Sequence, residues 1–309
     1  MIRLRAGRPW PTARALELLA VGPLAGLAWT LARLPSGLGL WVGRRLGDLV
    51  YWLLPDRRAA ARENLARAFG GERAGREVGR LCRESFRHLG MTFVEACTFF
   101  FRPPSVMLSR VEVEGVDHLK AAVAQGRGVL LLTAHFGNWE LLAAAHVQTG
   151  YPLSVVARPL DSPVLSRLIT RLREGGGVGV IPKRHAVRPV LEALRRGSMV
   201  GILLDQNTSR REGVFVPFFG ELASTSRSLA VLALSSGAPV VPVFIHREAG
   251  GRHQVVIDPA IPPPSTGDRE QDILAFTAVF AHVVESRIRQ WPEQWLWMHR
   301  RWKTRPAVR

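Results

Sequence analysis

The sequence of 309 residues contains very little cysteine, and this shortage limits the chemistry that it can support. Its two cysteines, Cys82 and Cys97, lie fifteen positions apart in a stretch with the periodicity of an amphipathic helix. That spacing is about four helical turns, so a disulfide within one straight helix is geometrically excluded. We therefore expect two small core residues in a reducing compartment, with no redox or metal role.

Acidic residues and lysine are also scarce. The chain has 25 Asp and Glu against 42 Lys and Arg, a net charge of +17, and lysine occurs only at positions 120, 183 and 303. Arginine therefore supplies the positive charge, and its planar guanidinium binds carboxylates and phosphates through paired hydrogen bonds. This balance favours an anionic membrane surface, an acidic protein or a nucleic acid as partner. An arginine-rich genome would explain the same composition without any partner.

Signatures of several enzyme classes are absent from the sequence. It has no G-x-S-x-G elbow, no G-x-x-x-x-G-K-[ST] phosphate loop and no G-x-G-x-x-G fingerprint opening a strand–helix unit. His88, His118 and His146 have no partners at the spacing of a zinc site. We therefore expect neither a cofactor nor a metal ion.

The N-terminal part of the chain contains a long apolar segment. From Ala15 to Leu34 the only charged residues are Glu17 and Arg33, and a helix of this length would cross a bilayer core of about 30 Å. Leu38 to Leu54 is apolar but carries charges within it, which suits a helix lying in the membrane interface. Arginines flank the first segment on both sides, so a span, a monotopic insertion and a buried core helix all remain open. We predict that residues 1–57 form a membrane-associating helical region.

The remaining residues, 58–309, alternate between helical and strand patterns and are predicted to form one α/β domain. Helices are expected over Arg58–Phe69, Arg76–Phe101, Trp139–Gln148, Val164–Glu174, Arg188–Arg196, Arg227–Ser236 and Asp268–Gln290. Strands are expected over Gly128–Thr133, Leu153–Ala157, Val178–Ile181, Met199–Leu204, Val240–Ile245 and Gln254–Ile257. Buried strands alternating with helices indicate a mainly parallel sheet flanked by helices. The tryptophan- and arginine-rich tail is expected to be a further helix packed on this domain.

The segment from Leu131 to Leu142 carries the clearest chemical signal. A buried strand ends there, and ligands bind at the carboxyl ends of strands in open α/β sheets. On one helix, the five-residue spacing would rotate Glu140 by about 500° from His135 and put the two side chains on different faces. His135 must therefore precede the helix and turn back toward Glu140. Asn138 is suited to cap that helix. A carboxylate accepting one imidazole N–H leaves the other nitrogen as a general base, although by spacing alone a structural histidine is equally common.

The motif His-Phe-Gly-Asn-Trp-Glu at 135–140 resembles the signature of the bacterial lipid A late acyltransferases, the lauroyl and myristoyl transferases of lipopolysaccharide synthesis. These belong to the lysophospholipid acyltransferase superfamily with its H-x-x-x-x-D/E motif. Further blocks resemble the family in order along the chain: Ala157–Pro163, Leu204–Gln206, Val216–Gly220, Ala223–Thr225, Gly237–Val243 and Trp297–Pro306. Ordered blocks are far more specific than one His–Glu pair.

The resemblance implies a glycerolipid-acyltransferase-like fold and the transfer of a fatty acyl group from acyl carrier protein to a hydroxyl of a lipid A-type glycolipid precursor. It implies His135 as general base with Glu140 as its partner. The expected substrate-binding residues are Arg158, Asp205, Gln206 and Asn138. Arg158 would hold an acceptor phosphate or the oxyanion, or alternatively pair with Asp161 or Asp205. Asp205 could likewise cap a helix or a turn.

The expected location is the cytoplasmic face of the inner membrane, with the membrane surface, acyl carrier protein and the lipid acceptor as partners. One alternative is another acceptor, such as a lysophospholipid or a phosphatidylinositol mannoside. Another is a non-catalytic protein that binds membrane lipid. Nucleic acid is disfavoured, because the apolar N-terminus and the ordered blocks would have no purpose in a nucleic-acid-binding protein.

Overall fold

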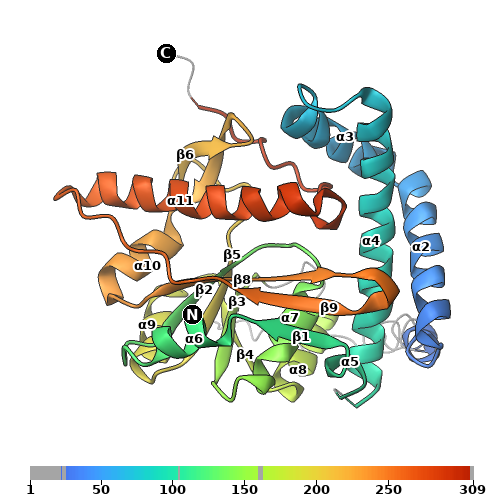
Figure 1. Ribbon diagram of the computed structural model, residues 1–309, viewed down its shortest axis with the longest axis horizontal. Coiled ribbons are helices and arrows are strands. Elements are labelled where there is room, and N and C mark those ends of the chain that lie inside the picture. The colour runs from blue at the N-terminus through green and yellow to red at the C-terminus, as the bar shows by residue number, and fades with distance from the viewer. Residues whose placement is uncertain (1–21, 23–25, 104, 159–162, 307–309) are drawn as a thin grey trace, which may run out of the picture.

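The computed structural model describes residue 22 and residues 26–103, 105–158 and 163–306. A seven-stranded sheet in the order β1-β9-β8-β2-β5-β3-β4 forms its centre, and β6 and β7 form a separate hairpin (Figure 1). The strands are β1 Val111–Glu114, β2 Val129–Thr133, β3 Leu153–Ala157, β4 Val178–Pro182, β5 Met199–Leu203, β6 Gly213–Phe218, β7 Glu221–Ser226, β8 Val240–Arg247 and β9 His253–Ile257. The helices are α2 Ser36–Leu53, α3 Pro55–Phe69, α4 Gly75–Phe101, α5 Ser105–Leu108, α6 Val116–Val123, α7 Trp139–Ala145, α8 Pro163–Gly175, α9 Val187–Arg195, α10 Ser228–Ser236 and α11 Arg269–Gln290.

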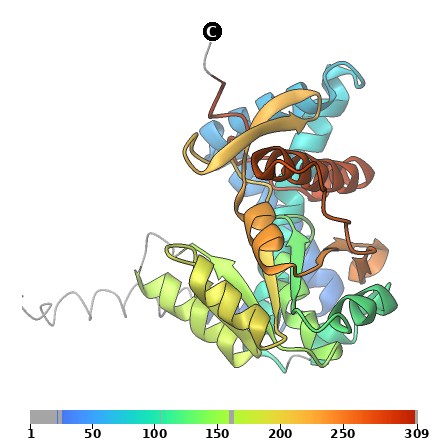
Figure 2. The ribbon, with the colours of Figure 1, turned by 90° about the vertical axis from the view of Figure 1, so that its left-hand side faces the viewer.

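Neighbouring strands of the central sheet run parallel, except that β8 and β9 pair antiparallel. Every residue of β2 and β8 is buried, as expected for strands covered on both faces. Leu130 and Leu132 belong to the core on one face, and Val129 and Leu131 to the core on the other. Figure 2 shows α11 lying beside the β6–β7 hairpin. The predicted α/β fold with a mainly parallel, helix-flanked sheet is confirmed.

Several parts of the fold differ from the sequence prediction, and the short helices α5 and α6 were not predicted. The short edge strand β1 and the β6–β7 hairpin were not predicted, because β1 has only four residues and Pro217 interrupts the strand pattern of β6. The predicted C-terminal helix is wrong: after the short 3₁₀ turn Pro292–Gln294, the tail is irregular. Trp295, Trp297 and Trp302 in this tail are buried in the main core, so packing rather than helical periodicity determines their spacing.

Helices α2 and α4 pack together almost backbone to backbone. A Cβ on Gly90 would lie 2.1 Å from the carbonyl oxygen of Gly43, and one on Gly47 would lie 2.3 Å from that of Phe86. Both distances are too short for real atoms, so only glycine allows this approach. Helix α4 in turn crosses the end of the central sheet, where the β8–β9 connection reaches it (Figure 1).

The predicted apolar segment from Ala15 to Leu34 falls largely outside the described residues. Where the structure describes it, residues 26–31 are helical. Within the described ranges, no helix is long and apolar enough to cross a membrane. Helix α2 matches the second predicted segment, Leu38 to Leu54, within two residues at each end.

Candidate active site

Strand register brings His135 and Asp205 together. Strands β2 and β5 are parallel neighbours in which Thr133 pairs with Leu203, and the N–H of Leu204 donates to the Thr133 carbonyl. His135 and Asp205 each follow two residues after that last pair. Both therefore leave the carboxyl edge of the sheet side by side, although seventy positions separate them in the sequence.

The carboxylate of Asp205 is buried and fully engaged. It accepts a hydrogen bond from His135 Nδ1 at 2.9 Å and one from the Trp295 indole Nε1 at 2.8 Å, and only 3% of the residue is exposed. Burial would raise the pKa of this carboxyl, but the charge of His135 and the hydrogen bonds from His135 and Trp295 outweigh burial and lower it to about 2. Asp205 therefore stays ionised over the whole physiological range.

The hydrogen bonds to His135 determine which nitrogen carries its proton. A carboxylate only accepts, so Nδ1 is protonated and Nε2 is the basic nitrogen of the neutral ring. Nε2 lies 3.4 Å from the side-chain amide nitrogen of Gln206, which can donate to it. The side chain of His135 is 24% exposed and its ring meets that of Trp139 edge to face, with centroids 5.3 Å apart. This arrangement presents a partly accessible base backed by a carboxylate.

Glu140 has a different partner from the one that the sequence predicted. Its carboxylate accepts two hydrogen bonds from Arg173 of α8, from Nε at 3.0 Å and from Nη2 at 2.5 Å. The expected hydrogen bond from the imidazole to Glu140 is replaced by the one to Asp205. The reason is geometric: the β2–β5 register places Asp205 beside the ring, whereas the first turn of α7 directs Glu140 toward α8.

Residues 134–138 are called the catalytic loop below because they carry the candidate base, and Asn138 is buried on the inner side of this loop. It is 1% exposed, and its side-chain oxygen accepts the N–H of Leu141, so it caps α7 as the sequence indicated. Its amide nitrogen donates to Glu95 of α4 at 2.9 Å. With both ends of the amide bound within the protein, Asn138 is placed to support the loop.

Arg158 follows β3 directly, on the same sheet edge as His135, and its side chain is exposed. Because β3 neighbours β5, Arg158 lies on the β5 side of His135. Further exposed basic residues occupy the loops after β4 and β5: Lys183, Arg184, Arg210 and Arg211. The carboxyl edge of the sheet is therefore rich in positive charge around the candidate base.

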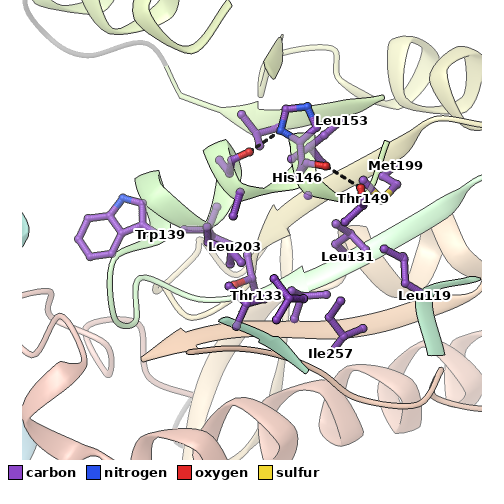
Figure 3. A pocket seen from close by; sticks show the side chains of 18 residues that line it. Leu119, Leu131, Thr133, Trp139, His146, Thr149, Leu153, Met199, Leu203 and Ile257 are labelled. Atoms are coloured by element: carbon purple, nitrogen blue, oxygen red, sulfur yellow. Dashed lines mark hydrogen bonds between the residues drawn. The ribbon is translucent and has the colours of Figure 1, made fainter. Parts of the chain in front are cut away.

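An apolar pocket opens beside the same site, between the sheet and α7 (Figure 3). Trp139, whose ring contacts His135, and Thr133, two residues before His135, both line it. The apolar lining also includes Leu131, Leu153, Met199, Leu203, Val243 and Ile257. Gly201 in β5 also lines the pocket, and its missing side chain leaves space there. The pocket suits a hydrocarbon chain.

Within the described part of the chain, no three His, Cys, Asp or Glu side chains gather as a metal site would require. Cys82 and Cys97 are free and buried, as predicted, and burial raises the pKa of each thiol to about 11. Neither thiol is therefore suited to act as a nucleophile.

Sequence reasoning missed two residues of this site, Trp295 and Arg173. Trp295 reaches Asp205 because residues 294–296 run antiparallel against residues 135–137, where Leu296 N–H donates to the His135 carbonyl. The tryptophan-rich tail was a visible signal, although its direction could not be inferred. Arg173 is one of many arginines in the sequence, and no pattern distinguishes it.

Comparison with known proteins shows the family to which the chain belongs. The family model for bacterial lipid A biosynthesis acyltransferases matches residues 16–304. The chain is 31% identical over 284 residues to the lipid A biosynthesis palmitoleoyltransferase of Escherichia coli (strain K12), covering 91% of this chain and 90% of that protein. The lauroyltransferase of the same organism gives the same figures. A phosphatidylinositol mannoside acyltransferase of Mycolicibacterium smegmatis is 30% identical over 248 residues, or 78% of each chain. The resemblance found in the sequence is confirmed, and the chain belongs to the bacterial lipid A biosynthesis acyltransferase family.

Proposed function

We propose that this acyltransferase moves a fatty acyl group from acyl carrier protein directly to a hydroxyl of a lipid A-type glycolipid precursor. The observation that carries the proposal is the imidazole of His135, which is held by buried Asp205 and presents its other nitrogen beside an apolar pocket. Neither cysteine is placed as a nucleophile, so transfer without an acyl-enzyme intermediate fits the site best.

In the proposed reaction, Nε2 of His135 takes the proton of the acceptor hydroxyl. The hydroxyl oxygen attacks the thioester carbonyl, and the tetrahedral intermediate then collapses with loss of the thiolate. The imidazolium returns its proton to the departing sulfur. Asp205 stabilises the imidazolium between these steps, because its carboxylate keeps its charge and its hydrogen bond to Nδ1 throughout.

We propose that Glu140 supports the His135–Asp205 pair without bonding to it. In the structure its carboxylate joins the first turn of α7 to Arg173 of α8. Glu140 would therefore hold the start of α7, and with it His135, in position. Gln206 would orient Nε2, and Arg158 would hold an anionic group of the acceptor or the developing oxyanion.

The acyl chain is proposed to lie in the apolar pocket (Figure 3), with its thioester where the ring of Trp139 contacts that of His135. The surrounding basic edge would attract an acidic carrier protein and the phosphates of the acceptor. A lipid A-type acceptor is favoured because the relatives include two lipid A acyltransferases. A phosphatidylinositol mannoside is the second candidate, favoured by the mycobacterial-type relative.

Residues 1–57 are proposed to rest on the inner membrane with the active site on the cytoplasmic side. Helix α2 presents large apolar side chains to solvent: Leu38, Trp41, Leu49, Trp52 and Leu53 are each about half exposed or more. At 100° per residue these positions fall within an arc of about 120°, opposite the glycine face that packs on α4. Arg45 and Arg58 lie against the rings of Trp41 and Trp52, as expected at a lipid headgroup layer.

The test of the reaction is mass spectrometry of lipids after incubation with acyl carrier protein or coenzyme A thioesters and a panel of acceptors. Wild type should add one acyl group, and His135→Ala should lose about 10²–10⁴-fold in rate. His282→Ala is the matched control, because this exposed histidine lies on α11. Near-normal transfer by His135→Ala would exclude the proposed base, and no product with any acceptor would exclude the reaction.

The membrane proposal has a separate test. Flotation with vesicles containing anionic lipid should recover wild type, and the double variant Trp41→Ala/Trp52→Ala should bind much less. Leu274→Ala/Val279→Ala provides the control, since these exposed apolar residues lie on α11. Equal loss in both double variants would refute a specific membrane face on α2.

A further inference from the structure

A cluster of buried polar side chains separates the catalytic loop from α4. Its central members are His88 and Glu95 of α4 and Arg247 at the end of β8, each less than 9% exposed. Burying charged groups is costly, and apolar side chains of similar volume usually stabilise a fold equally well. Apolar side chains could not supply directional hydrogen bonds. The hydrogen bonds of this cluster end on the catalytic loop.

Glu95 and Arg247 form a complete ion pair within the cluster. Nε of Arg247 donates to Oε1 of Glu95 at 3.0 Å, and Nη2 donates to Oε2 at 2.6 Å. His253 Nε2 lies 3.0 Å from the same carboxylate. Arg247 also lies against Thr92 Oγ1 at 3.1 Å. The carboxylate has one remaining partner, the Asn138 amide of the catalytic loop, at 2.9 Å.

His88 connects the same ion pair to the neighbouring residue of the loop. Nη1 of Arg247 lies 2.6 Å from Nδ1 of His88, and because a guanidinium only donates, Nδ1 must accept. The proton of the neutral ring is therefore on Nε2, which donates to the Gly137 carbonyl at 3.1 Å. Burial and the nearby Arg247 charge hold the pKa of His88 well below its usual value, so the ring stays neutral.

The two loop residues held in this way have little freedom. Gly137 has φ of +60°, and its N–H donates to the Gln294 carbonyl at 2.9 Å while its own carbonyl accepts from His88. The side-chain amide of Gln294 is itself tied to the backbone of Arg247: Oε1 accepts from the Arg247 N–H and Nε2 donates to the Arg247 carbonyl, each at 2.8 Å. Asn138 is bound at both ends of its amide. The peptide segment directly after His135 is thus fixed from several sides by one buried cluster.

We propose that His88 and Glu95 are positioning residues that hold Gly137 and Asn138, so that the His135 imidazole and the start of α7 keep their geometry for acyl transfer. The proposal rests on the acyltransferase reaction proposed above for His135. Neither residue contacts the reacting atoms. A displacement of about 1 Å at a reacting group costs on the order of 100-fold in rate, so loss of one such tether should reduce kcat.

A matched pair of His88 substitutions tests this without disturbing the Glu95–Arg247 ion pair. In His88→Asn the side-chain oxygen replaces Nδ1 as the acceptor for Arg247, but the donor to Gly137 is lost. In His88→Gln the side-chain NH₂ replaces Nε2 as the donor to Gly137. Acyl transfer would be measured for both, for wild type and for His135→Ala, together with thermal unfolding and amide hydrogen exchange of residues 134–141.

We expect His88→Asn to lose about 10- to 100-fold in kcat with little change in the KM for the acyl donor, and its loop amides to exchange faster. His88→Gln should stay within a few-fold of wild type in both measurements. Equal behaviour of the two variants, or an effect of His88→Asn on melting temperature alone, would overturn the positioning proposal. A wild type that transfers nothing, or a fully active His135→Ala, would instead overturn the reaction, and hydrogen exchange would still report on the tether.

Discussion

Replacing Asp205 by asparagine tests the most specific feature of the site, because it changes one oxygen to nitrogen at nearly constant volume. The wild-type carboxylate accepts from two donors, His135 Nδ1 and Trp295 Nε1, one on each oxygen. Asparagine has a single side-chain oxygen, so its NH₂ group must face one of these donors. If it faces His135, the ring must place its proton on Nε2, and the basic nitrogen is lost.

The expected loss of acyl-transfer rate in Asp205→Asn is large. In serine proteases the same change behind a catalytic histidine costs about 10⁴-fold in kcat through the wrong tautomer. The partner here also carries a charge that stabilises the imidazolium, in a buried environment where that charge acts strongly. We therefore expect Asp205→Asn to lose about 10³–10⁴-fold, which corresponds to about 4–5.5 kcal/mol in the activation free energy.

The assay is the initial rate of acyl transfer at saturating donor and acceptor, with circular dichroism to verify folding. Glu140→Gln is the informative comparison, since glutamine can still accept from Arg173. We expect it to lose about 10- to 100-fold by loosening the start of α7. A Glu140→Gln loss larger than that of Asp205→Asn would refute the pairing of His135 with Asp205 and restore the pairing with Glu140 that the motif predicted.

Three further predictions concern stability. Because folding lowers the pKa of Asp205, its ionised carboxylate should contribute about 2 kcal/mol to the free energy of unfolding above pH 4. This contribution should disappear as the pH falls from about 4 to 2. Urea unfolding at stepped pH should show the loss in wild type and not in Asp205→Asn. Gly137→Ala should destabilise by at least about 2 kcal/mol in thermal unfolding, because φ is +60° and the new Cβ would lie 1.8 Å from the Ile245 carbonyl oxygen; a smaller loss would mean that the loop relaxes freely. Glu95→Gln should cost about 3–5 kcal/mol in urea unfolding by leaving Arg247 buried without its anion, and Glu95→Leu combined with Arg247→Met should cost less.

Much of the architecture could be read from local patterns. The six predicted strands and the seven predicted helices (α3, α4 and α7 to α11) appear close to their predicted limits, because a buried strand needs a continuous apolar run and a surface helix needs a repeat near 3.6. The short helices α5 and α6 were not predicted. The helix cap at Asn138 and the buried thiols of Cys82 and Cys97 were also predictable. The tail failed because its buried tryptophans follow the shape of the core rather than a helical period.

The sequence by itself determined the alternation of buried strands and helices, the ordered motifs, the family and the position of His135 at a strand end. It could not determine which carboxylate meets the imidazole, since Glu140 is near in sequence and Asp205 is not. That choice depends on β5 lying beside β2 in one register, on residues 294–296 returning to the catalytic loop, and on α4 bringing Glu95 beneath it. Each of these contacts joins distant segments, and hydrogen bonds between such segments form only when the whole sheet and its covering helices are packed.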